Sequence, residues 1–203
     1  GLFSVKYYFN ELSEDQLNGD AQNNPPETMG NLVGFNYVDT QNGFNIYENE
    51  YYIPMGFTYD YYTTDSVIES AQEVQKTNIL LEALVLDQTQ INKYSDILQP
   101  YEYDAANLNS ETYKAVCEEK RSNSCYYFEE DTNGFDAAIQ LDEPKLVFFS
   151  VPYEQGWSAE VNGEPVDIEK VSYGFMAVEC PAGDNTITFT YETAGLTEGI
   201  VIS

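Results

Sequence analysis

The chain has 203 residues, of which 42% are hydrophobic and 15% aromatic, so it can bury one substantial core or two smaller ones. Thirty-five acidic residues against eight basic ones give a net charge of −27, which repels polyphosphate and excludes both nucleic-acid binding and docking on anionic lipid. Because the chain has no histidine, it lacks the commonest general base and the commonest zinc ligand. The simplest interpretation of the charge is a well-solvated surface, and a calcium or cationic ligand is the alternative.

In the first half of the chain, strand and hairpin signals come first. Leu2–Phe9 is predicted to form a strand, and the polar residues 11–28 a loop. Residues 34–39 and 44–47 flank Thr40-Gln-Asn-Gly43, and an Asn-Gly pair between apolar runs predicts a hairpin. The very aromatic Tyr51–Tyr62 segment is predicted to be a strand followed by an extended stretch.

Helix signals follow. Ser66, with Glu69 three residues later, has the spacing of a capping box and predicts that a helix begins there. Residues 78–86 are a short apolar run that fits a helix or a buried strand equally well. Ser110–Arg121 is predicted to form a short amphipathic helix whose last turn carries two basic residues.

The second half is the most regular. Residues 125–129 and 135–141 are predicted to pair around Asp131-Thr-Asn-Gly134. In Asn185–Tyr191, apolar residues alternate with threonines, as in a half-buried antiparallel strand. The turn signals from Lys145 onward predict a meander of four or five strands at 145–153, 157–161, 166–171, 174–180 and 185–192.

These elements predict a mainly-β fold, α+β overall. Its C-terminal half is expected to be a jelly-roll-like antiparallel β-sandwich, preceded by a hairpin and two or three short helices. The predicted domains are an α+β segment at 1–99, packed on the sandwich, and the sandwich itself at 100–203. No run of about 18 uncharged apolar residues is present. The apolar first and last segments suggest that both ends continue into a longer protein.

The three cysteines leave two interpretations open. Cys117 and Cys125 are separated by a short loop between a predicted helix and a predicted strand, so a disulfide between them is possible. Together with Cys180 they make an odd number, which also fits three reduced thiols. No Cys-x-x-Cys pair is present, so neither a metal knuckle nor a thioredoxin-type redox site is expected.

The candidate ligand-binding residues are aromatic. Trp157 is the only tryptophan, and it is either a core anchor or a flat platform for the apolar face of a sugar ring. Tyr153 and Tyr173 complete the set that we expect for a glycan. The tyrosines between 47 and 62 have the same two interpretations, half-buried packing and a binding surface.

Catalytic and metal-binding signals are weak. Asp131, Asn133 and Asp136 resemble part of a calcium loop, but a glutamate at the twelfth position is missing. Asp142 and Glu143 have no distinguishing context, and no carboxylate pair has a spacing that favours glycoside hydrolysis. Nucleophile motifs and phosphate-binding glycine loops are also absent from the sequence. We therefore predict no catalytic residue, no cofactor and no metal.

Short motifs along the chain resemble the C-terminal part of the YfhO-like family of bacterial polytopic membrane proteins. The C-terminal motifs are Val151-Pro-Tyr153, Gly156-Trp157, Val161-Asn-Gly163, Pro181-Ala-Gly183, Ile187-x-Phe-x-Tyr191, Gly195-Leu and Gly199–Ser203. The N-terminal motifs are Val5-Lys6-Tyr7-Tyr8, Ile46–Asn49 and Ile53-Pro54-x-Gly56-Phe57. The matching patches span nearly the whole chain, apart from residues 63–124, and their order is more specific than any one motif.

The resemblance implies the extracytoplasmic region of a membrane glycosyltransferase that uses lipid-linked sugars and modifies cell-envelope polymers. The catalytic acid of such enzymes lies near the first membrane helix, so no catalytic residue carries over to this chain. The implied partners are the membrane-embedded remainder of the same protein and a cell-envelope glycan. Two alternatives stay open: a structural or protein-interaction domain that caps the membrane helices, and a secreted carbohydrate- or calcium-binding module.

Overall fold

The computed structural model describes residues 3–13, 25–28, 32–102 and 110–193. The fold is mainly β, with several antiparallel sheets, few helices and a sandwich-like arrangement, which confirms the predicted fold class. Contacts divide the chain into two compact units, with the division between Ile53 and Pro54.

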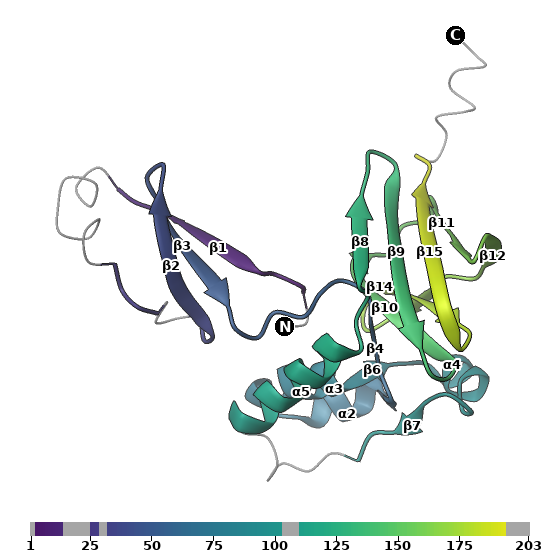
Figure 1. The fold of residues 1–203 in the computed structure, drawn as a ribbon. Coiled ribbons are helices and arrows are strands. Elements are labelled where there is room, and N and C mark those ends of the chain that lie inside the picture. Colours follow the sequence, from purple (N-terminus) through teal and green to yellow (C-terminus); the bar gives the residue numbers. More distant parts are fainter. Residues whose placement is uncertain (1–2, 14–24, 29–31, 103–109, 194–203) are drawn as a thin grey trace. The chain divides into compact units, whose positions relative to one another are not determined.

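The first unit is a three-stranded antiparallel sheet in the order β1-β3-β2 (Figure 1). Its strands are β1 (Tyr7–Glu11), β2 (Phe35–Gln41) and β3 (Phe44–Asn49). The β2–β3 hairpin forms as predicted, because Asn42 and Gly43 both take positive φ values, 52° and 83°, as the tight Asn-Gly turn requires. A bulge between Tyr37 and Asp39 interrupts the pairing of β2 with β3.

The second unit contains the sandwich. One sheet has the order β13-β14-β10-β4 and the other the order β12-β11-β15-β9-β8. The strands of the first sheet are β4 (Phe57–Thr58), β10 (Lys145–Pro152), β13 (Glu169–Val171) and β14 (Phe175–Cys180). Those of the second are β8 (Tyr127–Glu130), β9 (Gly134–Leu141), β11 (Trp157–Val161), β12 (Glu164–Val166) and β15 (Gly183–Tyr191).

The main core lies between the two sheets. The ring of Phe135 on β9 is centred 5.1 Å from that of Phe149 on β10, and Phe189 on β15 lies 4.5 Å from Phe135. Val147, Met176 and Val178 complete the layer, and all of these side chains are buried. Each strand presents alternate residues to this layer, so the alternation seen at residues 185–191 is the pattern that buries Ile187 and Phe189.

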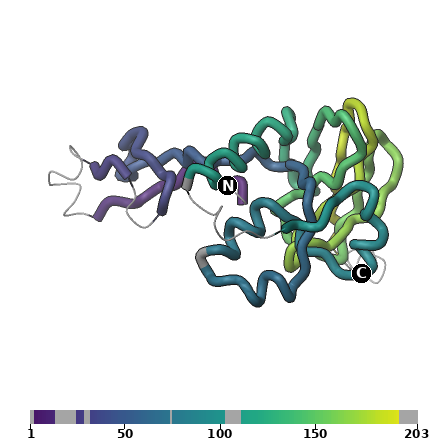
Figure 2. The backbone as a smooth tube through the Cα atoms, turned by 90° about the horizontal axis from the view of Figure 1, so that it is seen from below, coloured from purple at the N-terminus to yellow at the C-terminus, as the bar shows by residue number. Residues whose placement is uncertain are grey.

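A smaller layer completes the second unit. The short strands β5 (Tyr61–Thr63), β6 (Ala83–Val85) and β7 (Gln99–Pro100) form a parallel sheet in the order β6-β5-β7. Its helices are α2 (Asp65–Ser70), α3 (Glu73–Glu82), α4 (Gln88–Lys93) and α5 (Ser110–Ser122). In both views this blue-to-teal layer lies beside the green-to-yellow strands of the sandwich (Figures 1 and 2).

The structure corrects two local predictions and answers one question that the sequence left open. Four strands of the predicted meander exist, but the strand predicted at 166–171 is divided between β12 and β13, which lie in different sheets. Consecutive strands also do not simply pair: β10 joins β14 and β4, whereas β11 joins β12 and β15 in the opposite sheet. Helix α2 has Thr64 rather than Ser66 at its N-cap, and no side-chain cap forms. Residues 78–86 are both predicted elements in turn, since α3 ends at Glu82 and β6 follows directly.

The domain boundary predicted between residues 99 and 100 differs from the division observed at Ile53–Pro54. Strand β4 explains the difference, because Phe57 and Thr58 pair with Phe148 and Val147 in the sandwich sheet. The helix predicted at 110–121 and the hairpin at 125–141 are confirmed. Most of the loop predicted at 11–28 lies outside the described residues.

Candidate functional site

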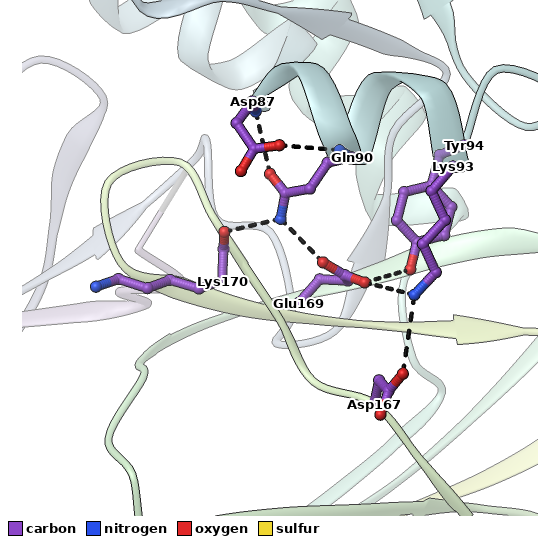
Figure 3. Close-up of polar contacts among 7 residues, drawn as sticks. All are labelled: Asp87, Gln90, Lys93, Tyr94, Asp167, Glu169 and Lys170. Carbon is purple, nitrogen blue, oxygen red and sulfur yellow. Dashed lines mark hydrogen bonds and ion pairs between the residues drawn. The ribbon is translucent and has the colours of Figure 1, made fainter.

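A carboxylate network fixes strand β13 against helix α4 (Figure 3). Glu169 accepts hydrogen bonds from Gln90 Nε2 at 2.9 Å, Lys93 Nζ at 2.7 Å and Tyr94 Oη at 2.8 Å. Asp87 caps α4 by accepting from the backbone N–H groups of residues 89 and 90, so the helix presents these donors in a fixed register. Strand β13 is therefore held at one end of the sandwich sheet.

The network also sets protonation states. Burial alone would raise the pKa of Glu169, but the hydrogen bonds from Lys93, Gln90 and Tyr94 outweigh it and hold that pKa below its usual value. The hydrogen bond with Glu169 raises the pKa of Lys93, and burial raises that of Tyr94 to about 12. At neutral pH this is thus an ion pair with a neutral tyrosine, a structural clamp rather than a proton-transfer group.

The turn that follows β13 is strained. Ser172 and Tyr173 both take positive φ values, 46° and 69°, before Gly174 at 129°. Left-handed backbone costs about 1–2 kcal/mol for a residue with a side chain and is an outlier for a bulky one. The turn persists because Ser172 is anchored to β6: its N–H donates to the Val85 carbonyl at 3.0 Å, and its Oγ accepts from the Val85 N–H at 3.1 Å. The strained turn turns Tyr173 outward, and 62% of that residue is exposed.

Tyr153 lies beside this turn. Its backbone N–H donates to the Gly174 carbonyl at 2.7 Å, and 38% of the residue is exposed. Two of the three aromatic residues that the sequence predicts for a glycan site therefore lie on adjoining backbone segments, the end of β10 and the β13–β14 turn. Sequence spacing did not predict that these segments adjoin.

Charged groups lie near Tyr173 and its turn. Burial is the main cause that raises the pKa of Tyr173. The negative charge of Asp65, a hydrogen bond with the Asp65 carboxylate and the charge of Glu69 raise this pKa further, so both carboxylates of α2 act on the Tyr173 hydroxyl. Lys170, two residues from the turn, brings its Cε within 3.7 Å of the position that a Cβ on Gly174 would occupy. Among the residues that the structure describes, the Lys170 ammonium has no ion-pair partner, and Figure 3 shows it pointing away from the Glu169 network.

Trp157 lies elsewhere, on the edge of the core. Its ring is half-buried and packs against Phe135 at 5.7 Å, Phe189 at 6.2 Å and Tyr191 at 5.1 Å. These contacts support the core-anchor interpretation of the sequence. A role of Trp157 as a sugar platform stays a prediction.

The cysteines form no disulfide in the structure. All three are free and buried. Cys117 lies on α5, whereas the Cys125 sulfur points into the sandwich core that also contains Cys180, against Gly56. Burial raises the pKa values of Cys125 and Cys180 to about 12, so neither is a thiolate at neutral pH.

The weak calcium signal has a structural explanation. Asp131 Oδ1 accepts from the Asn133 backbone N–H at 2.7 Å, which shapes the β8–β9 turn. Asp136 accepts from the Thr188 hydroxyl on the neighbouring strand at 2.6 Å. Within the described ranges, no group of three or more cysteine or acidic residues is arranged to hold a metal ion.

A polar cleft of about 520 Å³ lies between the small parallel sheet and β9–β10. Lys145 lines the cleft and donates to Asp60 and Glu143, each at 2.6 Å, so two carboxylates of the cleft are already paired. Gln99, Asn123, Gln140 and Tyr61 also face it. The ion pairs of Lys145 join the walls of the cleft. Asp142 and Glu143, which have no distinguishing context in the sequence, both line this cleft.

Comparison with known proteins supplies the family. The model of the bacterial membrane protein YfhO matches residues 1–134 and 98–203, which together cover the whole chain. The chain belongs to the YfhO family. No curated protein and no solved structure gives a significant match.

Membership of the YfhO family implies a membrane-embedded remainder. Across the described part of this YfhO chain, no helix is both long and apolar enough to cross a bilayer. The family match confirms the resemblance inferred from the Gly156-Trp157 and Asn162-Gly163 motifs, and it also covers the motifs of the first unit.

Proposed function

We propose that this YfhO chain is a non-catalytic extracytoplasmic module that binds an acceptor glycan of the cell envelope. It holds that glycan near the membrane-embedded remainder of the same protein, for which the family resemblance implies a glycosyltransferase acting on lipid-linked sugars. The observation that supports binding is the exposed Tyr173 on a strained turn, beside exposed Tyr153. Strain retained at an exposed bulky residue is typical of functional positions.

The chemistry of this end of the sandwich suits a sugar. A tyrosine ring stacks on the apolar C–H face of a pyranose. Carboxylates of Asp65 and Glu69 accept hydrogen bonds from sugar hydroxyls, and the Lys170 ammonium donates one. Because the Ser172–Val85 contacts already fix the turn, a ligand would lose little ordering entropy in the protein on binding.

A glycan array tests this function. The 203-residue chain, detected through an affinity tag at one terminus, is applied to an array of bacterial envelope glycans, and hits are measured by titration calorimetry. Tyr153→Ala and Tyr173→Ala should each weaken a hit by about tenfold, which corresponds to about 1.4 kcal/mol for the loss of one stacked ring. The matched control is Tyr126→Ala, an exposed tyrosine on a different edge, which should bind like the unmodified chain.

A structural or protein-interaction role is the second candidate. Trp157 favours it, because its ring packs against Phe135, Phe189 and Tyr191 rather than standing free. In that case no glycan would bind, and parent-protein activity would fall only with variants that unfold the module. Unchanged glycan binding by the Tyr153 and Tyr173 variants would also count against our proposal. A secreted carbohydrate-binding module is the third reading, and the gene's flanking sequence would distinguish it.

A further inference from the structure

The polar cleft beside Lys145, here called the Asp60–Lys145 cleft, is large enough for a small ligand. Its volume of about 520 Å³ lies within the range of ligand pockets in proteins. The residues that line it come from the β4–β5 segment, the loop between α4 and β7, the end of α5 and the β9–β10 turn. All of these segments belong to the second unit, so the cleft lies within one compact body.

One buried hydroxyl in this cleft is not used by the fold. Thr58 on β4 pairs with Val147 on β10, and the threonine is only 7% exposed. Thr58 lines the cleft, and its hydroxyl has no hydrogen-bond partner among the described residues. A buried hydroxyl without a partner is costly to keep, because folding removes it from water without replacing its hydrogen bonds. The Thr58 hydroxyl is therefore available to a ligand in the cleft.

The cleft is strongly acidic. Four carboxylates line it, those of Asp60, Asp96, Asp142 and Glu143, together with the ammonium of Lys145. Burial alone would lower the pKa of Lys145, but its hydrogen bonds with Asp60 and Glu143 outweigh burial and raise that pKa, so the lysine stays charged and paired. Four carboxylates against one ammonium leave a net charge of −3, and an acidic cleft of this kind concentrates cations.

Two of the carboxylates are available to such a cation. Within the described ranges, Asp96 and Asp142 have neither a hydrogen-bond nor an ion-pair partner, and they come from different segments, the loop after α4 and the β9–β10 turn. The amide oxygens of Asn123 and Gln140 add acceptors for N–H groups. Tyr61, which is 43% exposed, adds an aromatic ring, and aromatic rings attract ammonium groups.

We propose that the Asp60–Lys145 cleft binds a linear polyamine, an organic cation whose ammonium groups are joined by methylene chains. One ammonium group pairs with Asp96 and another with Asp142, and the Thr58 hydroxyl accepts a hydrogen bond from the ligand. The methylene chain crosses the Tyr61 ring, and the separation of the two aspartates selects the length of the chain. This site is separate from the Tyr153–Tyr173 site and does not depend on glycan binding.

Titration calorimetry with the full 203-residue chain tests the proposal. The ligands are the linear diamines from 1,3-diaminopropane to 1,6-diaminohexane, in a buffer of physiological ionic strength. Magnesium chloride is the control for a double positive charge without a chain. The control for a chain with a single ammonium group is 1-aminobutane.

Three variants separate the cleft from the acidic surface as a whole. Asp96→Asn with Asp142→Asn removes the two available carboxylates, and Thr58→Val replaces the hydroxyl with a methyl group without a change of charge. The matched control is Glu160→Gln with Glu164→Gln, which removes two carboxylates from exposed positions on β11 and β12. Circular dichroism checks that each variant is folded.

The proposal expects one diamine molecule per chain, with an affinity that peaks at one chain length and exceeds those of magnesium and 1-aminobutane by at least about tenfold. The aspartate double variant should weaken the best diamine by at least about tenfold, Thr58→Val severalfold, and the glutamate double variant by less than about twofold. Equal losses in the two double variants, or equal binding of magnesium and of every diamine, would overturn the proposal, because the attraction would then come from the net charge alone. The lack of saturable diamine binding would overturn it as well.

Discussion

Ser172 and Val85 are joined by two hydrogen bonds, from the Ser172 N–H to the Val85 carbonyl at 3.0 Å and from the Val85 N–H to Ser172 Oγ at 3.1 Å. Their positions are 87 residues apart in the chain. This contact ties the strained β13–β14 turn to the small parallel sheet, and so fixes the place where Tyr173 leaves the surface.

Ser172→Ala should lower the free energy of unfolding by about 1–3 kcal/mol. The substitution leaves the buried Val85 N–H without an acceptor, and an unpaired buried donor costs about that much. Urea unfolding followed by circular dichroism measures the change. Ser158→Ala, which removes an exposed hydroxyl from β11, is the matched control and should change stability by less than about 0.5 kcal/mol.

Tyr173→Asn should stabilise the module by about 0.5–1 kcal/mol while it abolishes glycan binding at that position. Asparagine tolerates left-handed backbone better than tyrosine does, and 62% of the tyrosine is exposed, so little packing is lost. Opposite effects on stability and binding are the signature of a residue retained for function. A variant that is clearly less stable than the unmodified chain would show that Tyr173 supports the fold instead.

Two glycines with similar backbone conformations separate strain from crowding. Gly56 and Gly163 have φ values of 76° and 80°. A Cβ on Gly56 would come within 2.4 Å of Cys125 Sγ and 2.9 Å of Phe149, whereas a Cβ on Gly163 would meet nothing within 4 Å. Gly163→Ala should therefore cost about 1 kcal/mol of stability from backbone strain alone, and Gly56→Ala at least about 2 kcal/mol more. Equal losses in denaturant melts would contradict the described packing at Gly56.

Lys120 predicts a pH dependence. It is only 6% exposed, donates to the Thr58 carbonyl at 3.0 Å and lies 3.9 Å from the centre of the Tyr59 ring. Burial lowers its pKa to about 8, against the opposing charges of Glu119, Asp60, Glu82 and Cys117.

Between pH 8 and about 10.5 the unfolded chain therefore holds a proton on Lys120 that the folded chain has lost, and the contribution of Lys120 to stability rises with pH. Lys120→Met removes this dependence. The stability difference, variant minus unmodified chain, should fall by about 3 kcal/mol from pH 7 to pH 10, and a constant difference would contradict a buried ammonium.

Glu169 predicts the opposite dependence in acid. Its folded pKa lies below the usual value, so its stabilising contribution is present above the unfolded pKa, near 4.5, and is lost as the pH falls through the folded pKa. Glu169→Gln should cost about 1–2 kcal/mol at pH 7, and the loss should shrink below pH 4.5. Asp167→Asn is the control, because Asp167 is almost fully exposed and lies 4.0 Å from Lys93.

The sequence predicted local structure better than it predicted partners. The hairpin at Asn42-Gly43 and the strand at residues 185–191 follow from turn chemistry and alternation, which are local properties. Alternation does not say which strand lies beside which, so the assignment of β10 and β11 to different sheets was missed. The helix start at Thr64 was missed because Ser66 and Glu69 offer a good capping pattern, whereas the helix begins directly after β5 ends at Thr63.

The candidate glycan site stays a prediction, and the sequence could name only some of its residues. Tyr153 and Tyr173 were named from the sequence, but the contacts that bring them together run through Gly174 and Val85, which carry no signal of their own. No residue pattern announces left-handed backbone at a serine and a tyrosine, because these residues rarely adopt it. Asp65 and Glu69 were two among 35 acidic residues until the fold placed them beside Tyr173.

The central claim is that Tyr153 and Tyr173 form one glycan-binding surface. The most direct measurement is a ¹⁵N-correlation titration of the 203-residue chain with the best array glycan. We predict that the largest saturable shifts fall on Tyr153, Tyr173, Gly174 and Asp65, and that Tyr173→Ala removes them while the rest of the spectrum is kept. Shifts centred on Trp157 or on the Asp60–Lys145 cleft, or no shifts with any array glycan, would contradict the claim.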